Sequence, residues 1–93
     1  MISVFKLING ENIISEVVDP SELILKNPAS IIIQQTEHGM GVGLAPFMPY
    51  AKGNITLYHS AIAAKSVPDV ELENEYSRIF GSGLVIAQAG SIK

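Results

Sequence analysis

The sequence predicts a mostly β fold, in which about five antiparallel strands are followed by one helix near the C-terminus. Short runs rich in β-branched and aromatic residues alternate with turn residues between residues 2 and 66. Apolar residues at helical spacing follow after residue 66. The chain has 93 residues, which is the length of one domain. We therefore expect a single domain over residues 1–93.

Turn residues divide the strand-forming part of the chain. Asn9-Gly10 favours the positive φ angles of a tight hairpin turn, and Pro28 predicts a bend or an edge position within a strand. Residues 37–41 are expected to form a loop. Pro46 and Pro49 cannot donate to a ladder, so the segment that holds them reads as a broken strand. The predicted strand segments are residues 2–8, 13–19, 23–33, 42–50, 55–58 and 61–66.

The C-terminal part of the chain changes to a helical pattern. Leu72, Tyr76 and Phe80 recur at helical spacing, and a polar, acidic segment before them is typical of a helix start. We expect the barrel strands to end near residue 67 and a helix to cover about residues 67–80. A further apolar run predicts a short extra strand over about residues 84–89.

Composition limits the classes of function. The charged fraction is 16% and the net charge is −3, so we expect some apolar surface to contact a partner and general attraction to phosphate to be weak. The chain contains no cysteine, which excludes disulfides and thiolate metal sites and fits a cytoplasmic protein. We expect neither a signal peptide nor a membrane span.

Three stretches together resemble the Sm-like (Sm/LSm) superfamily, and especially the bacterial RNA chaperone Hfq. The first is Val-Phe-Lys-Leu-Ile-Asn-Gly-Glu-Asn-Ile-Ile at residues 4–14, which is similar to the first hairpin of the family. The second is Asp19 followed by Leu-Ile-Leu-Lys-Asn at residues 23–27. The third is Tyr-His-Ser-Ala-Ile at residues 58–62, running on to Val67-Pro68. The overall pattern looks most like small Sm-like proteins of marine tailed phages of the cyanophage type.

This resemblance implies a five-stranded, strongly bent antiparallel barrel that assembles into a cyclic homo-oligomer of about five to seven subunits. Residues 28–53 would be a long insertion between the third and fourth strands. The resemblance also implies RNA binding at a pore-facing loop that holds Tyr58, His59 and Ser60. If a phage encodes the chain, the host cytoplasm is the expected location.

The sequence departs from the family pattern at positions that matter for RNA. Hfq-type proteins carry a Lys-His pair after the motif tyrosine, where this chain has His59 and Ser60. The uridine-contacting asparagine of Sm proteins falls on Glu22, whose carboxylate would repel phosphate. The family also places its helix before the barrel. The alternative function is therefore a structural or protein-interaction ring that has lost RNA binding.

Each group of candidate residues has a plainer interpretation. Tyr58 could pack at a subunit interface, with His59 a solvated loop residue, instead of contacting unpaired bases. The aromatic and methionine side chains near residue 48 are candidates for partner contact, and they could equally cap the open end of the barrel. This second group consists of Phe47, Met48 and Tyr50.

The sequence does not favour an enzyme, a metal site or a cofactor. A metal site needs three or four converging ligands, and the chain has two histidines and no cysteine. His38 is better read as an exposed loop residue. The alternating Glu71, Glu73 and Glu75 cannot all share one helix face, which argues against a paired acid and base. The glycines of residues 39–43 lack the features of a phosphate-binding loop.

Overall fold

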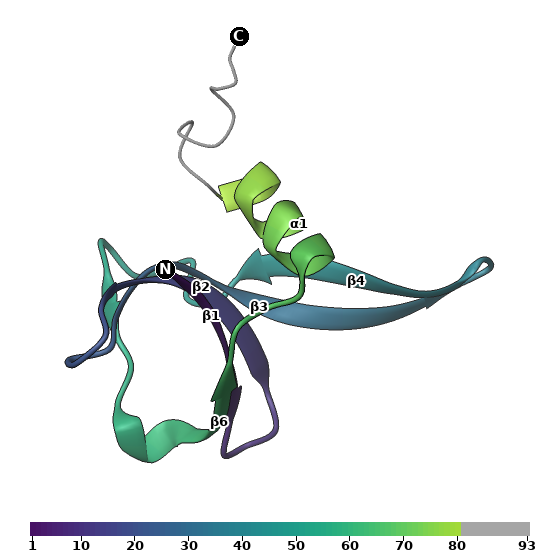
Figure 1. The fold of residues 1–93 in the computed structure, drawn as a ribbon. Helices are drawn as coiled ribbons and strands as arrows, with labels where there is room; N and C mark the ends of the chain where they lie inside the picture. Colours follow the sequence, from purple (N-terminus) through teal and green to yellow (C-terminus); the bar gives the residue numbers. More distant parts are fainter. Residues whose placement is uncertain (81–93) are drawn as a thin grey trace, which may run out of the picture.

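The chain folds into a six-stranded antiparallel sheet that carries one α-helix on one face (Figure 1). The computed structural model describes residues 1–80, so the strand predicted over residues 84–89 lies outside the described residues. The elements are β1 (Ile2–Leu7), β2 (Asn12–Asp19), β3 (Ile24–Thr36), β4 (Gly39–Pro46), β5 (Ile55–Thr56), the 3₁₀-helix η1 (His59–Ala61), β6 (Ile62–Ser66) and α1 (Val70–Phe80).

The strand order is β4-β3-β2-β1-β6, and the short β5 pairs with the start of β3. The last strand, β6, therefore pairs with the first strand, β1. The predicted mostly β, antiparallel class with a C-terminal helix is confirmed. The sheet is strongly curved, but among the described strands it stays open, with β4 and β6 at its edges. It has six strands, one more than the five-stranded barrel that the resemblance implies, because β4 lies within the segment expected to be an insertion.

The first hairpin turns at Asn9 and Gly10 as predicted. Gly10 has a φ of +93°, which glycine adopts without steric cost. The Asn9 side chain holds the turn from both sides, because its amide donates to Glu11 Oε1 at 2.9 Å and its Oδ1 accepts from the Glu11 amide at 3.0 Å. The Gly10 amide donates to the Leu7 carbonyl at 2.9 Å. Local chemistry is enough to fix this hairpin.

A bulge bends β3 where Pro28 predicted a bend. Lys26 and Ala29 pair with β2, and the register shifts between them, at Asn27 and Pro28. Asn27 takes a φ of +55°, a left-handed conformation that asparagine tolerates. Pro28 has no amide hydrogen for the ladder, and its carbonyl accepts from the Phe47 amide at 2.8 Å. Because of the bulge, the single long strand β3 bends and runs through both halves of the sheet.

The prediction of a loop over residues 37–41 is wrong. Only Glu37 and His38 lie between β3 and β4, because Gly39 with a φ of +114° closes a tight hairpin. Thr36 Oγ1 accepts from the His38 amide at 3.2 Å and donates to the Gly39 carbonyl at 2.8 Å. The fourth strand accordingly covers Gly39–Pro46 and not residues 42–50. It ends at Pro46, which pairs with Ala29.

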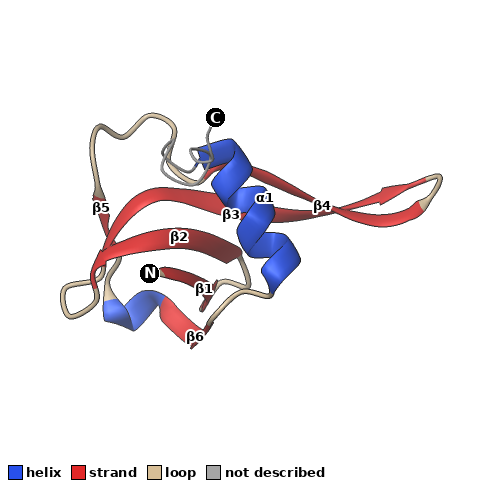
Figure 2. Cartoon of the chain, turned by 45° about the horizontal axis from the view of Figure 1, so that its top comes forward, coloured by secondary structure: helices blue, strands red, loops and turns tan. Residues whose placement is uncertain are grey.

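Two hydrophobic clusters lie on opposite faces of the curved sheet. The larger cluster fills the inside of the curve and consists of Phe5, Leu7, Ile13, Val17, Leu23, Leu25 and Leu57. The helix α1 lies over one face of the sheet (Figure 2). The smaller cluster joins the helix to the sheet and is built around Ile14, Ala29 and Tyr76. Alternation along β2 separates the two, since successive residues of a strand point to opposite faces.

The helix begins at Val70, a little after the predicted start near residue 67. Asp69 caps it, because Asp69 Oδ1 accepts from the Leu72 amide at 2.8 Å and satisfies a donor of the first turn. Of the predicted apolar face, Tyr76 is buried, while Leu72 and Phe80 are half-buried against the sheet. Among residues 1–80 no helix has the length and hydropathy that crossing a bilayer requires.

The Tyr76 side chain of α1 reaches the bulge in β3. Its hydroxyl accepts from the Glu16 amide at 3.1 Å and lies 2.9 Å from the Lys26 carbonyl and 2.8 Å from the Asn27 carbonyl, to which it donates. These backbone groups lie where the β2–β3 register shifts. One side chain of α1 therefore satisfies polar groups that the bulge removes from the ladder.

Replacing Tyr76 by Phe should lower the free energy of unfolding by about 1–3 kcal/mol, because backbone groups of β2 and β3 would lose their partner. Urea unfolding monitored by circular dichroism measures the change. Tyr50→Phe is the matched control, since the Tyr50 side chain is 82% exposed. Equal midpoints for the two variants would contradict the role assigned to the Tyr76 hydroxyl.

Alkaline pH should destabilise the protein through the same residue. Burial raises the pKa of Tyr76 above its usual range. The unfolded chain therefore loses this proton first, and the stability contributed by the neutral hydroxyl is complete below about pH 10 and lost as pH rises through the folded-state value. The difference between wild type and Tyr76→Phe in urea midpoint should shrink above that pH. A difference that stays constant up to about pH 11, roughly one unit above the usual tyrosine pKa, would contradict this.

Candidate functional site

Tyr58, His59 and Ser60 lie together at the turn between β5 and β6. The single turn of η1 forms because the Ala61 amide donates to the Tyr58 carbonyl at 2.9 Å. Just before it, the buried Leu57 anchors the chain in the larger cluster. Tyr58, His59 and Ser60 are all exposed, and the Tyr58 side chain is 73% exposed. The turn thus presents a ring, an imidazole and a hydroxyl to solvent.

A second loop lies beside this turn. His59 Nε2 is 3.2 Å from the Ser21 carbonyl, to which it donates in the tautomer that carries hydrogen on that nitrogen. The Leu57 amide also donates to the Leu23 carbonyl at 2.9 Å. Residues 19–23, which connect β2 and β3, are therefore held against residues 57–61. We call these two segments the paired loops. Nothing in the local sequence around Ser21 indicated this contact.

Asp19 fixes the first of the paired loops. Its Oδ1 accepts from the Ser21 amide at 3.0 Å, the Ser21 hydroxyl at 2.9 Å and the Glu22 amide at 3.2 Å. The Glu22 amide and the Ser21 hydroxyl hold the pKa of Asp19 below its usual range. Leu23 follows with a φ of +55° while its side chain is buried. The loop is thus strongly specified, and it carries a carboxylate that stays charged at neutral pH.

The paired loops have a definite chemical character. An exposed tyrosine ring offers a stacking surface, and His59 and Ser60 offer polar groups for the edges of a base or for a peptide. Asp19 and the exposed Glu22 place negative charge beside them. Such a surface suits flat, polar ligand parts and disfavours phosphate.

The other predicted candidates do not form one surface. Phe47 is half-buried and packs against the larger cluster. Met48 lines a hollow of about 280 Å³ together with Pro28, Pro46 and Phe80. Tyr50 is 82% exposed. The structure therefore places Phe47 where it helps to close the core and leaves Tyr50 open to solvent.

Within residues 1–80 no group of three or more His, Asp or Glu side chains is arranged to hold a metal ion. His38 lies exposed in the β3–β4 turn. No family model matches the chain, and no curated protein matches it.

Replacing His59 by Ala should loosen the paired loops without unfolding the protein. The lost contact is exposed, so global stability should fall by at most about 1 kcal/mol. Hydrogen exchange at the Glu22 and Leu57 amides should become faster, because local opening sets their protection. Ser60→Ala is the control from the same turn. Unchanged exchange at both amides in His59→Ala would show that the imidazole does not hold the loops together.

Proposed function

We propose that this chain is an Sm-like subunit that assembles into a closed homo-oligomeric ring of about five to seven copies and binds unpaired RNA bases at the paired loops. The observation that carries the proposal is the contact between His59 and the Ser21 carbonyl. It joins the loop after the second strand to the turn before the last strand, which lie in two of the three stretches that resemble the Sm family.

The course of the chain supports the proposed family. A last strand that pairs with the first strand agrees with the strongly bent antiparallel barrel that the resemblance implies. The bulge at Pro28 and the curvature of the sheet agree with it too. The helix α1 follows the strands, which departs from the family arrangement.

The sheet edges support assembly. Both β4 and β6 leave one side unpaired among the described residues. An exposed edge is a template for another strand. Joining β4 of one subunit to β6 of the next is a head-to-tail contact, which closes into a ring when the rotation between subunits allows it.

The chemistry of the paired loops favours contact with bases over contact with phosphates. Tyr58 would stack on a base, while His59 and Ser60 would bond to base edges. Asp19 and Glu22 would repel the backbone, and affinity would fall little with added salt because few phosphates would be neutralised. The same two carboxylates favour the second candidate function, a ring whose loops contact a protein and not RNA.

Titration of the purified assembly with U-rich and A-rich RNA oligomers, at several salt concentrations, tests the proposal. Tyr58→Ala should weaken binding about ten-fold or more, because stacking contributes about 1–3 kcal/mol per base. Glu22→Gln should strengthen binding by removing one repulsive charge. Lys52→Ala is the control, since it removes a positive charge on a distant turn and should change little.

Two outcomes would contradict the RNA assignment. One is an intact wild-type assembly that binds neither oligomer in low salt, which would leave the protein-interaction ring as the function. The other is a steep fall of affinity with salt together with a large effect of Lys52→Ala, which would move the site to the basic residues. Each variant must first be shown to keep the mass of the wild-type assembly.

A further inference from the structure

The β3–β4 hairpin extends beyond the body of the protein as an arm, which we define as residues 31–44 (Figure 1). Its register places Ile31 opposite Leu44, Ile33 opposite Val42 and Gln35 opposite Met40. One face of the arm therefore carries an apolar strip. We define this strip as Ile31, Ile33, Met40, Val42 and Leu44.

The other face of the arm is built differently. There the glycines of β4 lie opposite Ile32, Gln34 and Thr36. The Gln34 side chain covers Gly43 so closely that an added Cβ would come within 3.3 Å of its amide nitrogen. The two faces thus differ in composition, and the apolar side chains that β4 contributes to the arm, those of Met40, Val42 and Leu44, are all on one of them.

The inner end of the strip packs in the core, and its outer side chains are exposed to solvent. Ile31 and Leu44 pack in the smaller cluster beneath α1. Farther along, Ile33 is 61% exposed, Val42 is 52% exposed and Met40 is 69% exposed. A two-stranded hairpin in water has little stability by itself, so this strip is the part of the arm that gains most from a partner.

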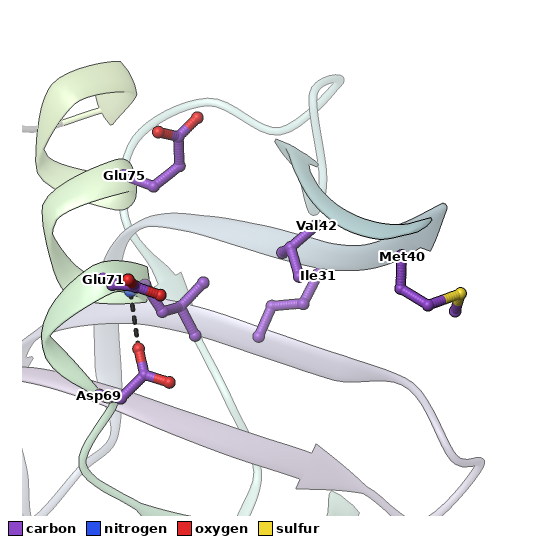
Figure 3. A pocket seen from close by; sticks show the side chains of 7 residues that line it. Ile31, Met40, Val42, Asp69, Glu71 and Glu75 are labelled. Atoms are coloured by element: carbon purple, nitrogen blue, oxygen red, sulfur yellow. Dashed lines mark hydrogen bonds between the residues drawn. The ribbon is translucent and has the colours of Figure 1, made fainter. Parts of the chain in front are cut away.

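A hollow of about 420 Å³ lies between the arm and α1 (Figure 3). Its floor is formed by Ile31, Met40 and Val42, and its wall carries Asp69, Glu71 and Glu75. Asp69 caps the helix, and Glu75 pairs with Arg78 at 2.6 Å. Glu71 makes no ion pair among the described residues. The hollow therefore fits an apolar surface that also brings a cation.

The opposite edge of the same sheet offers such a surface. Val4 and Lys6 of β1 pair with Ser66 and Ala64 of β6, and Val4 also pairs with Ile14 of β2. Because Ile14 pairs with Ala29, which is two residues before Ile31, all of these side chains lie on the sheet face that carries the strip. These β1 and β6 residues also line a shallow, mostly apolar hollow, together with Asn12 and Lys65. Lys6 is exposed and makes no ion pair within residues 1–80.

We infer that the apolar strip docks against a second copy of this chain, on the surface formed by Val4, Lys6 and Ala64. The contact rests on the proposed ring, because joining β4 to the next copy's β6 continues the sheet and brings the two surfaces onto one face. The acidic wall of the hollow then meets Lys6 of the neighbouring copy. The arm thus adds a side-chain interface to the strand pairing.

The first test measures self-association by sedimentation equilibrium. The double variant Ile33→Thr/Val42→Thr keeps β-branched side chains but makes the strip polar, and it should raise the subunit dissociation constant at least about ten-fold. The matched control is Ile32→Thr/Val18→Thr, in which Ile32 is on the other face of the arm and Val18 is 51% exposed on β2. This control should assemble as the wild type does.

The second test exchanges charges. Glu71→Lys and Lys6→Glu should each weaken association, and combining both in one chain should restore it, because the pair would re-form with its signs reversed. Restoration is not expected if either residue acts only within its own subunit. Failure of the double exchange to restore association would overturn the assigned contact.

The outcomes separate this inference from the proposed function. Assembly of the Thr double variant with wild-type affinity would overturn docking by the strip while leaving the ring in place. A wild-type chain that stays monomeric at micromolar concentration would overturn both. Loss of assembly in the strip variant, with RNA binding absent even in the wild-type ring, would support the docking and reject the RNA assignment.

Discussion

The hydrogen bonds of the Tyr76 hydroxyl are the interaction on which most of this structure depends. The hydroxyl connects α1 to the point where β2 and β3 lose register, and it satisfies the Glu16 amide and the carbonyls of Lys26 and Asn27. The bulge bends β3 at this point, and the strand then continues to Thr36. The helix position, the curvature of the sheet and the projection of the arm therefore follow from one buried tyrosine and the segment that it caps.

The bend also places the two surfaces that are proposed to be functional. The first half of β3 pairs with β5 and so leads the chain to the turn that carries Tyr58 and His59. The second half pairs with β4 and leaves the body as the arm. The positions of the paired loops and of the apolar strip thus both depend on the course of β3. In the proposed ring, the loops would meet the ligand and the strip would meet the next subunit.

Local signals in the sequence predicted the elements whose stability is local. Asn9-Gly10 indicated the first hairpin, Pro28 indicated the bend, and the spacing of Leu72, Tyr76 and Phe80 indicated the helix. The prediction of a loop over residues 37–41 is wrong because glycines that are typical of a loop here allow a tight turn and a strand with glycines along one face. The pairing of His59 with Ser21 and the destination of the Tyr76 hydroxyl could not be predicted, since both depend on residues distant in the chain.

Closure of identical subunits into a ring, through the two edges of the sheet, is the proposal on which the ligand site and the docking of the arm both rest. Electron microscopy of the purified wild-type chain, with two-dimensional class averages, tests it most directly. We expect closed particles with rotational symmetry and about five to seven subunits. Open filaments would show that the head-to-tail contact forms without closing, and single compact particles of monomer size would contradict the assembly altogether.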